Sequence, residues 1–154
     1  MAAVQLTHAL VPAMVRRGHG AVLNIGSGAG HAAMPNAAVY TESKHFIRVF
    51  SESLRAQLKE TGVIVCEAAP GPVETEFDRI AGIEGGATPG QNLFRITAGE
   101  CARDIIQQFG RGTAVIYPGR MYRWLMRLQP LMPRSLLVAQ IAKNAHELRT
   151  RVRA

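Results

Sequence analysis

A tyrosine and a lysine stand four residues apart in the segment VYTESK, as Tyr40 and Lys44. Side chains at i and i+4 lie on one face of a helix. A free phenol has a pKa of about 10 and is a poor base at neutral pH, but a nearby ammonium lowers that pKa by stabilising the phenolate. Tyr40 beside Lys44 could therefore donate and accept a proton. The same spacing arises by chance on surface helices, so the pair alone leaves both interpretations open.

A serine in the Gly-rich segment NIGSGAG, at positions 24–30, is the second candidate. Ser27 directly follows a predicted strand, thirteen residues before Tyr40, and ligands of open α/β sheets bind at the carboxyl ends of strands. The alternative is a Gly-rich turn with an uninvolved serine. The spaced glycines are not a dinucleotide fingerprint, because His31 stands where the motif continues and Pro35 interrupts the following run.

The segment PGPVETEF, at positions 70–77, directly follows a second predicted strand. Proline and glycine end that strand at the same edge of the sheet as Ser27, and Thr75 could hydrogen-bond a ligand there. The alternative is a simple strand-ending turn.

Helical and strand-like segments alternate along the chain, which predicts an α/β fold with a parallel sheet. We expect helices over 2–17, 38–60, 98–110 and 120–129, with a further one from about 134 to 149, and strands over 21–27, 63–69 and 113–119. Residues 71–97 are rich in Gly, Pro and Thr and predict a long loop with one short helix. The expected buried stripe of the second helix is Val39, Phe46, Ile47, Phe50, Leu54 and Leu58. Three strands would leave the apolar edge of the first one bare, so further strands or a partner chain should cover it.

Composition restricts the class of protein. With 154 residues, 47% hydrophobic and 19% charged, the chain has the composition of a globular domain. Its longest apolar runs are too short to span a bilayer, and no secretory signal opens it. The two cysteines, Cys66 and Cys101, and five scattered histidines indicate neither a disulfide framework nor a metal site, which fits a cytoplasmic location. The net charge of +7 lies in residues 120–154, so a basic nucleic-acid-binding domain is not expected.

The three motifs together resemble the short-chain dehydrogenase/reductase family. The order is a strand with Gly and Ser, then Tyr, then Lys four residues later, then a strand followed by Pro–Gly–x–Val–x–Thr. The resemblance extends over residues 1–119, through LVPAMVRRGHGAVLNIGS, YTESK and PGPVETEF. It implies an incomplete Rossmann-like, doubly wound parallel sheet of about three strands with flanking helices.

The resemblance also implies roles for individual residues in the interconversion of a carbonyl and an alcohol with NAD or NADP. Tyr40 would be the general acid/base, Ser27 would hydrogen-bond the reacting oxygen, and Lys44 would lower the tyrosine pKa. The residues implied for cofactor binding are Tyr40, Lys44, Pro70, Gly71, Val73 and Thr75. A mildly apolar small-molecule substrate is compatible with Met34, Ile80 and Phe94, whereas His31 and His45 are taken as ordinary residues.

Two family features are not found in this sequence: the turn T-G-x-x-x-G-x-G that holds the pyrophosphate, and the N-N-A-G segment. We therefore expect the C-terminal portion of a family domain, without its dinucleotide-binding half. One interpretation is that the sequence covers only part of an active oxidoreductase. The other is a truncated, inactive fragment that acts through interactions or at a membrane. For the 154 residues as written, we expect weak cofactor binding and weak or no catalysis. The sequence does not indicate whether NAD or NADP is preferred.

We expect residues 120–154 to form a basic, amphipathic helical extension. This segment contains eight Lys/Arg residues and a single acidic residue, Glu147. Such a helix either lies on an anionic membrane surface or packs on the domain with its arginines in water. A peripheral membrane location is the open alternative to a purely cytoplasmic one. By the resemblance, helices 1–17 and 38–60 would form a homo-oligomer interface.

Overall fold

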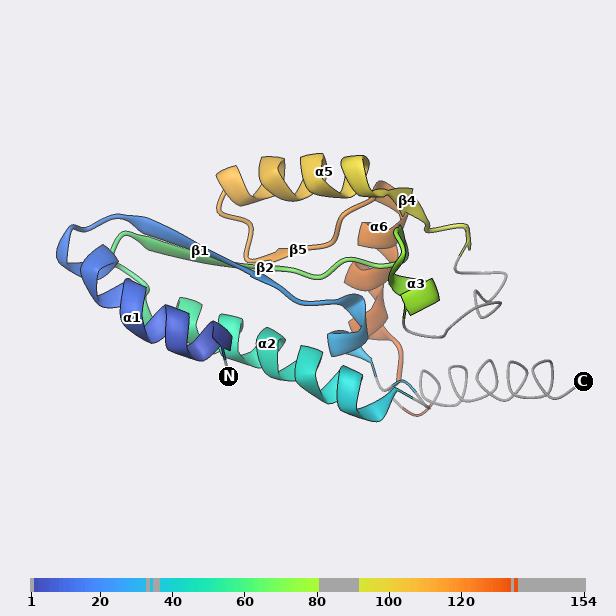
Figure 1. Cartoon of the computed structure of the whole chain (residues 1–154), viewed down its shortest axis with the longest axis horizontal. Helices are drawn as coiled ribbons and strands as arrows, with labels where there is room; N and C mark the ends of the chain where they lie inside the picture. The colour runs from blue at the N-terminus through green and yellow to red at the C-terminus, as the bar shows by residue number, and fades with distance from the viewer. Residues whose placement is uncertain (1, 33, 35–36, 81–91, 134, 136–154) are drawn as a thin grey trace, which may run out of the picture.

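Helices and strands alternate along the chain in a computed structural model that describes residues 2–32, 34, 37–80, 92–133 and 135 (Figure 1). The longer helices confirm the periodicity of the sequence. The elements are α1 (Ala2–Arg16), β1 (Gly20–Ile25), the 3-10 helix η1 (Gly28–His31), α2 (Ala38–Gln57), β2 (Val63–Ala68), β3 (Val73–Glu74), α3 (Phe77–Ile80), β4 (Ile96–Thr97), α5 (Ala98–Gly110), β5 (Val115–Ile116), α6 (Arg120–Leu128) and the 3-10 helix η2 (Gln129–Leu131).

The main sheet is parallel and has the strand order β1-β2-β5. The pairing of β1 with β2 runs from Gly20 opposite Val63 to Ile25 opposite Ala68. Helices α1 and α2 cover one face of this sheet and α5 covers the other (Figure 1). The expected α/β class and parallel sheet are confirmed, and β1 lies at the edge of the described sheet, as the sequence predicted.

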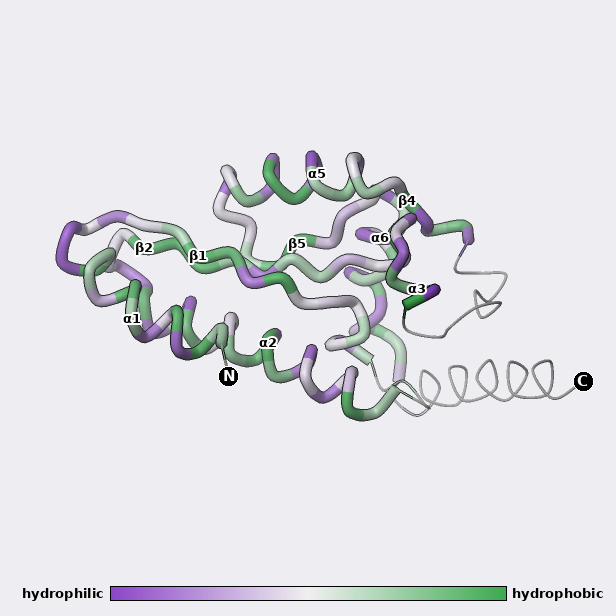
Figure 2. Tube along the Cα trace, in the orientation of Figure 1, coloured by the Kyte–Doolittle hydropathy of each residue, from purple (hydrophilic) through white to green (hydrophobic). Residues whose placement is uncertain are grey.

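The apolar core lies between the sheet and α5. Cys66 and Ala68 of β2 and Ile116 of β5 are fully buried and pack with Cys101 and Ile105 of α5. Strands β1 and β2 are hydrophobic along most of their length in Figure 2, as expected for strands covered on both faces. Both cysteines are free thiols, and burial raises the pKa of each.

Polar contacts hold α2 on the opposite face. The buried Asn24 amide donates to Ser51 Oγ at 2.9 Å, and Ser51 Oγ donates to the Ile47 carbonyl at 2.7 Å. The Arg55 guanidinium donates to the carbonyls of Val65 and Gly112 at 2.6 and 3.0 Å. These bonds tie α2 to β1, to β2 and to the turn before β5.

The predicted buried stripe of α2 is wrong at two positions. Val39 is 81% exposed and Phe46 is 50% exposed. The other four expected residues are half-buried, and the buried residue of α2 is Ser51. An amphipathic pattern shows which side of a helix is apolar, but not how wide the surface beneath it is.

The segment after β2 is more ordered than expected. Strands β3 and β4, of two residues each, pair in parallel through Val73 opposite Ile96. Strand β5 is shorter than the expected 113–119, because the buried Pro118 and Gly119, with φ of 91°, turn the chain into α6. The helix expected over about 134–149 lies outside the described residues apart from residue 135.

Candidate active site

The carboxyl ends of β1 and β2 continue side by side beyond the sheet ladder. The Gly26 amide donates to the Ala68 carbonyl at 2.7 Å, and the Gly28 amide donates to the Pro70 carbonyl at 2.8 Å. Ser27 lies between these two bonds. The structure therefore places the NIGSGAG turn directly beside the Pro–Gly turn, as two parallel strands ending at one edge predict.

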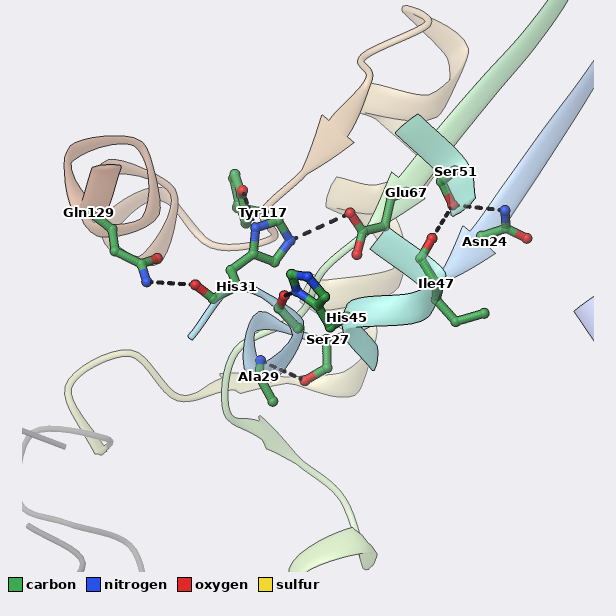
Figure 3. A network of polar contacts seen from close by, with 11 residues as sticks. Asn24, Ser27, Ala29, His31, His45, Ile47, Ser51, Glu67, Tyr117 and Gln129 are labelled. Carbon is green, nitrogen blue, oxygen red and sulfur yellow. Dashed lines mark hydrogen bonds and ion pairs between the residues drawn. The ribbon is translucent and has the colours of Figure 1, made fainter. Parts of the chain in front are cut away.

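Ser27 begins η1. Its Oγ accepts a hydrogen bond from the Ala29 amide at 3.2 Å, with the serine backbone extended (Figure 3). The side chain is half-buried. Because Oγ is the acceptor in this contact, its own proton remains available to donate to another oxygen.

The 3-10 helix η1 packs tightly on α2. A Cβ at Gly30 would lie 2.6 Å from the Lys44 carbonyl oxygen, so only glycine fits this close approach. The ring nitrogen Nδ1 of His45 lies 2.9 Å from the Gly30 carbonyl, to which it donates (Figure 3). This packing fixes the second turn of α2 beside the Ser27 turn. His45, taken as ordinary from the sequence, holds the junction together.

Tyr40 and Lys44 share one face of α2, as their spacing predicts. Lys44 Nζ lies 5.7 Å from the centroid of the Tyr40 ring, within range of a cation–π interaction. The Tyr40 ring also lies near Phe77 of α3, with ring centroids 5.9 Å apart. Phe77 follows Thr75, whose Oγ1 accepts from the Phe77 amide at 3.3 Å. The segment after the Pro–Gly turn thus folds back onto Tyr40.

Tyr122 of α6 is part of this edge and was missed from the sequence. It is 7% exposed. A Cβ at Gly71 would lie 2.7 Å from ring carbon Cε2, and a Cβ at Gly28 would overlap the hydroxyl oxygen. Burial, followed by the neighbouring Tyr117 and Glu67, raises the pKa of this phenol. A single aromatic side chain therefore packs against both turns, and each turn has a glycine where Tyr122 needs space.

A buried polar cluster around His31 lies next to the Ser27 turn (Figure 3). His31 Nε2 lies 3.4 Å from Glu67 Oε2, and their side chains are only 7% and 2% exposed. His31 Nδ1 lies 3.2 Å from the Tyr117 hydroxyl, and Gln129 Nε2 donates to the His31 carbonyl at 3.0 Å. Burial, then the nearby Glu67 charge, raises the pKa of Tyr117. His31, also taken as ordinary, thus connects η1 to β2, to the segment after β5 and to η2.

A family model for short chain dehydrogenases matches residues 1–82, which contain the Ser27 turn, the Tyr40–Lys44 pair and the Pro–Gly turn. The chain belongs to the short chain dehydrogenase family. The match starts at residue 1 and lies in the N-terminal part of this chain, so the family model does not extend to residue 119 as the resemblance had suggested.

Curated relatives in this family include reductases and dehydrogenases. The chain is 42% identical over 106 residues to a sulfoacetaldehyde reductase of Chromohalobacter salexigens, covering 68% of this chain and 42% of the relative. It is 44% identical over 78 residues to the NADP-dependent 3-hydroxy acid dehydrogenase YdfG of Escherichia coli K12, covering 50% of this chain and 32% of the relative. The chain thus spans less than half the length of the curated relatives it matches.

Solved structures of the family share the fold over more of the chain. A short-chain dehydrogenase from Sphingobium yanoikuyae in complex with NADPH aligns with a TM-score of 0.67 and 28% identity, over 79% of this chain and 46% of that one. A short chain dehydrogenase from Burkholderia cenocepacia aligns with a TM-score of 0.72 and 24% identity, over 90% of this chain and 54% of that one. The similarity therefore supports a partial Rossmann-like fold of this family. In the described part of the chain, no helix is long and apolar enough to cross a membrane.

Proposed function

We propose that this chain carries the proton-transfer site of an oxidoreductase that interconverts a carbonyl and an alcohol with NADP(H). The observation that supports this proposal most directly is the convergence of three motifs at one sheet edge. The Gly28–Pro70 hydrogen bond joins two of them, and the contact of Gly30 with the Lys44 backbone joins the third.

The proton chemistry follows from the side chains at this edge. In carbonyl reduction the Tyr40 hydroxyl gives its proton to the carbonyl oxygen, while Ser27 Oγ–H donates a hydrogen bond to that oxygen and orients it. The Lys44 ammonium, beside the Tyr40 ring, stabilises the phenolate left behind. The Phe77 ring, itself 50% exposed, lies beside Tyr40 with ring centroids 5.9 Å apart.

The residues present are compatible with a nicotinamide cofactor at this edge. Lys44 offers a cationic donor for ribose hydroxyls, and the half-buried residues Pro70–Val73 follow β2 at the same edge of the sheet. Thr75 is the remaining candidate contact. The bound cofactor would supply or accept the hydride. NADP is favoured over NAD because the Sphingobium structure is a complex with NADPH and YdfG is NADP-dependent.

The order of the motifs supports a finer assignment of residues 1–119 to the portion of the family domain that follows the pyrophosphate-binding turn. Ser27, Tyr40 and the Pro–Gly turn occur in that order, and the sequence contains no T-G-x-x-x-G-x-G segment. The alternative function is that of a fragment that folds but does not turn over substrate. The two proposals differ in what the isolated chain does with NADPH.

The test measures NADPH binding by fluorescence and NADPH oxidation by absorbance, using the 154-residue chain. Sulfoacetaldehyde and an apolar ketone serve as substrates in one direction, and a 3-hydroxy acid with NADP in the other. Tyr40→Phe should lower turnover at least about 100-fold because it removes the acid/base group. Ser27→Ala and Lys44→Met should each lower turnover, whereas the exposed matched controls Ser53→Ala and Lys59→Met should not.

Wild-type turnover that survives Tyr40→Phe would contradict the proposed role of this tyrosine. A folded chain that neither binds NADPH nor turns over any of the three substrates would instead favour the inactive fragment.

A further inference from the structure

Helix α6 has two different faces. One faces the domain: Tyr122 and Met126, at i and i+4, are 7% and 8% exposed. Arg123 is fixed to the domain as well, because its guanidinium donates to both carboxylate oxygens of Asp104, at 2.6 and 2.8 Å, and to the Tyr117 carbonyl at 3.2 Å. These contacts place α6 at the carboxyl end of the sheet (Figure 1).

The other face is apolar and exposed. Trp124 is 66% exposed and Leu128 is 53% exposed. The exposed apolar residues of α6 recur at i, i+3, i+4 and i+7 and continue through η2: Met121, Trp124, Leu125, Leu128, Leu131 and Met132. This spacing places those of α6 in one stripe opposite Tyr122 and Met126.

The charges that α6 itself carries beside this stripe are positive, although Arg120 shares a cleft with Glu100 and Asp104 of α5. Arg120 and Arg127 are exposed, and α6 contains no acidic residue. From residue 120 to the end of the sequence, eight basic residues accompany a single glutamate. The exposed face is therefore complementary to a surface that is both apolar and anionic.

We propose that the outer face of α6 and η2, defined by the stripe above with Arg120 and Arg127, docks on an anionic lipid surface. An amphipathic helix with Trp and Leu on one side and arginines at its flanks lies in the headgroup region, with its rings at the acyl boundary. A protein partner would need an apolar patch that fits the stripe in shape and acidic residues beside it that face the arginines. The lipid surface supplies both properties without a specific shape. This proposal is independent of the catalytic assignment.

The direct probe is the fluorescence of Trp124, the only tryptophan in the sequence. The 154-residue chain is titrated with phosphatidylcholine vesicles that contain phosphatidylglycerol, and with vesicles of phosphatidylcholine alone. The expected result is a blue shift with the anionic vesicles only, reversed by high salt because screening weakens the attraction. An unchanged emission maximum with anionic vesicles would overturn the proposal.

Co-sedimentation with the same vesicles tests the residues. Arg120→Gln combined with Arg127→Gln should lower partitioning on the order of twentyfold, since each basic residue near an anionic surface contributes about 1 kcal/mol, or roughly fivefold. Arg16→Gln combined with Arg111→Gln, two exposed arginines in the last turn of α1 and at the C-terminal cap of α5, is the matched control and should change little.

Leu128→Ser tests the apolar contribution and should lower partitioning about tenfold, whereas Ile106→Ser, at a residue 68% exposed on α5, should not. Circular dichroism establishes that each variant is folded. The proposal fails if the variants sediment like their controls. It also fails if the chain binds no vesicles but self-associates in sedimentation velocity through Leu128, which would assign the face to a second copy.

Discussion

The contact of Tyr122 with the Ser27 turn and the Pro–Gly turn predicts a specific clash. In Gly28→Ala, the new Cβ would overlap the Tyr122 hydroxyl oxygen, while the next neighbours are ring carbon Cζ at 2.9 Å and the Pro70 carbonyl oxygen at 3.4 Å. The hydroxyl is therefore the main obstacle. Tyr122 is buried, so its ring has little freedom to move away.

The magnitude follows from the packing. Forcing an extra methyl group into a filled site costs about 1–3 kcal/mol, and a direct overlap with a buried side chain places Gly28→Ala toward the upper end. Removing the oxygen by Tyr122→Phe leaves the 2.9 Å approach to Cζ, short of an ordinary contact by roughly half an ångström. The double variant should thus recover at least about 1 kcal/mol relative to the sum of the single changes.

The assay is urea unfolding of the four proteins of this double-mutant cycle, with Gly110→Ala as a control. A Cβ at Gly110 meets nothing within 4 Å, and the residue ends α5, so that substitution should be neutral or slightly stabilising. Single effects of Gly28→Ala and Tyr122→Phe that simply add would refute the reasoning, because additivity means that the two groups do not meet.

Three further predictions concern the elements that support this edge. Thr97→Ala removes the side-chain half of a reciprocal cap, in which Thr97 Oγ1 accepts from the Glu100 amide, and leaves the bond from the residue 97 amide to the Glu100 carboxylate. It should cost about 1 kcal/mol in urea unfolding, and no loss would contradict the cap. Asp104→Ala leaves the partly buried Arg123 without the carboxylate whose two oxygens accept its hydrogen bonds, and should lower the free energy of unfolding by about 2 kcal/mol. A decrease below about 0.5 kcal/mol, as at an ordinary surface position, would count against this contact. Burial raises the pKa of Tyr122, so its contribution to stability is complete below about pH 10 and is lost as the pH rises above that value, because the unfolded chain releases the proton first. The free energy of unfolding should accordingly fall less steeply above about pH 10 in Tyr122→Phe than in the wild type, and equal slopes would exclude a raised pKa there.

Much of the fold could be predicted because its main elements are long or end at residues that stop a helix or strand. Helices α1, α2 and α5 repeat apolar residues at helical spacing. Strands β1 and β2 are mainly apolar, apart from Asn24 and Glu67, and are followed by glycine or proline. Strands β3 and β4 could not be found this way, because two residues are too few to show a period. The 50% exposure of Phe46 depends on what packs against α2, which the helix sequence does not contain.

The candidate site could be predicted only where its members follow one another along the chain. Ser27, Tyr40 and Gly71 lie in consecutive elements, so their shared edge follows from parallel strand order. Tyr122 reaches the same edge from the far end of the chain. Its place depends on how α6 turns after Gly119, and the buried pair of His31 and Glu67 likewise has no spacing signal.

Helix α6 connects its outer surface physically to the Ser27 turn and the Pro–Gly turn. Tyr122 and Trp124 are two residues apart on this nine-residue helix and point to opposite sides, so a shift of the helix would move both. An occupant of the outer face that binds more tightly when Tyr122 is seated against Gly71 must favour the ordered turns. By thermodynamic reciprocity, a ligand that orders the turns must then strengthen the binding of that occupant by the same factor.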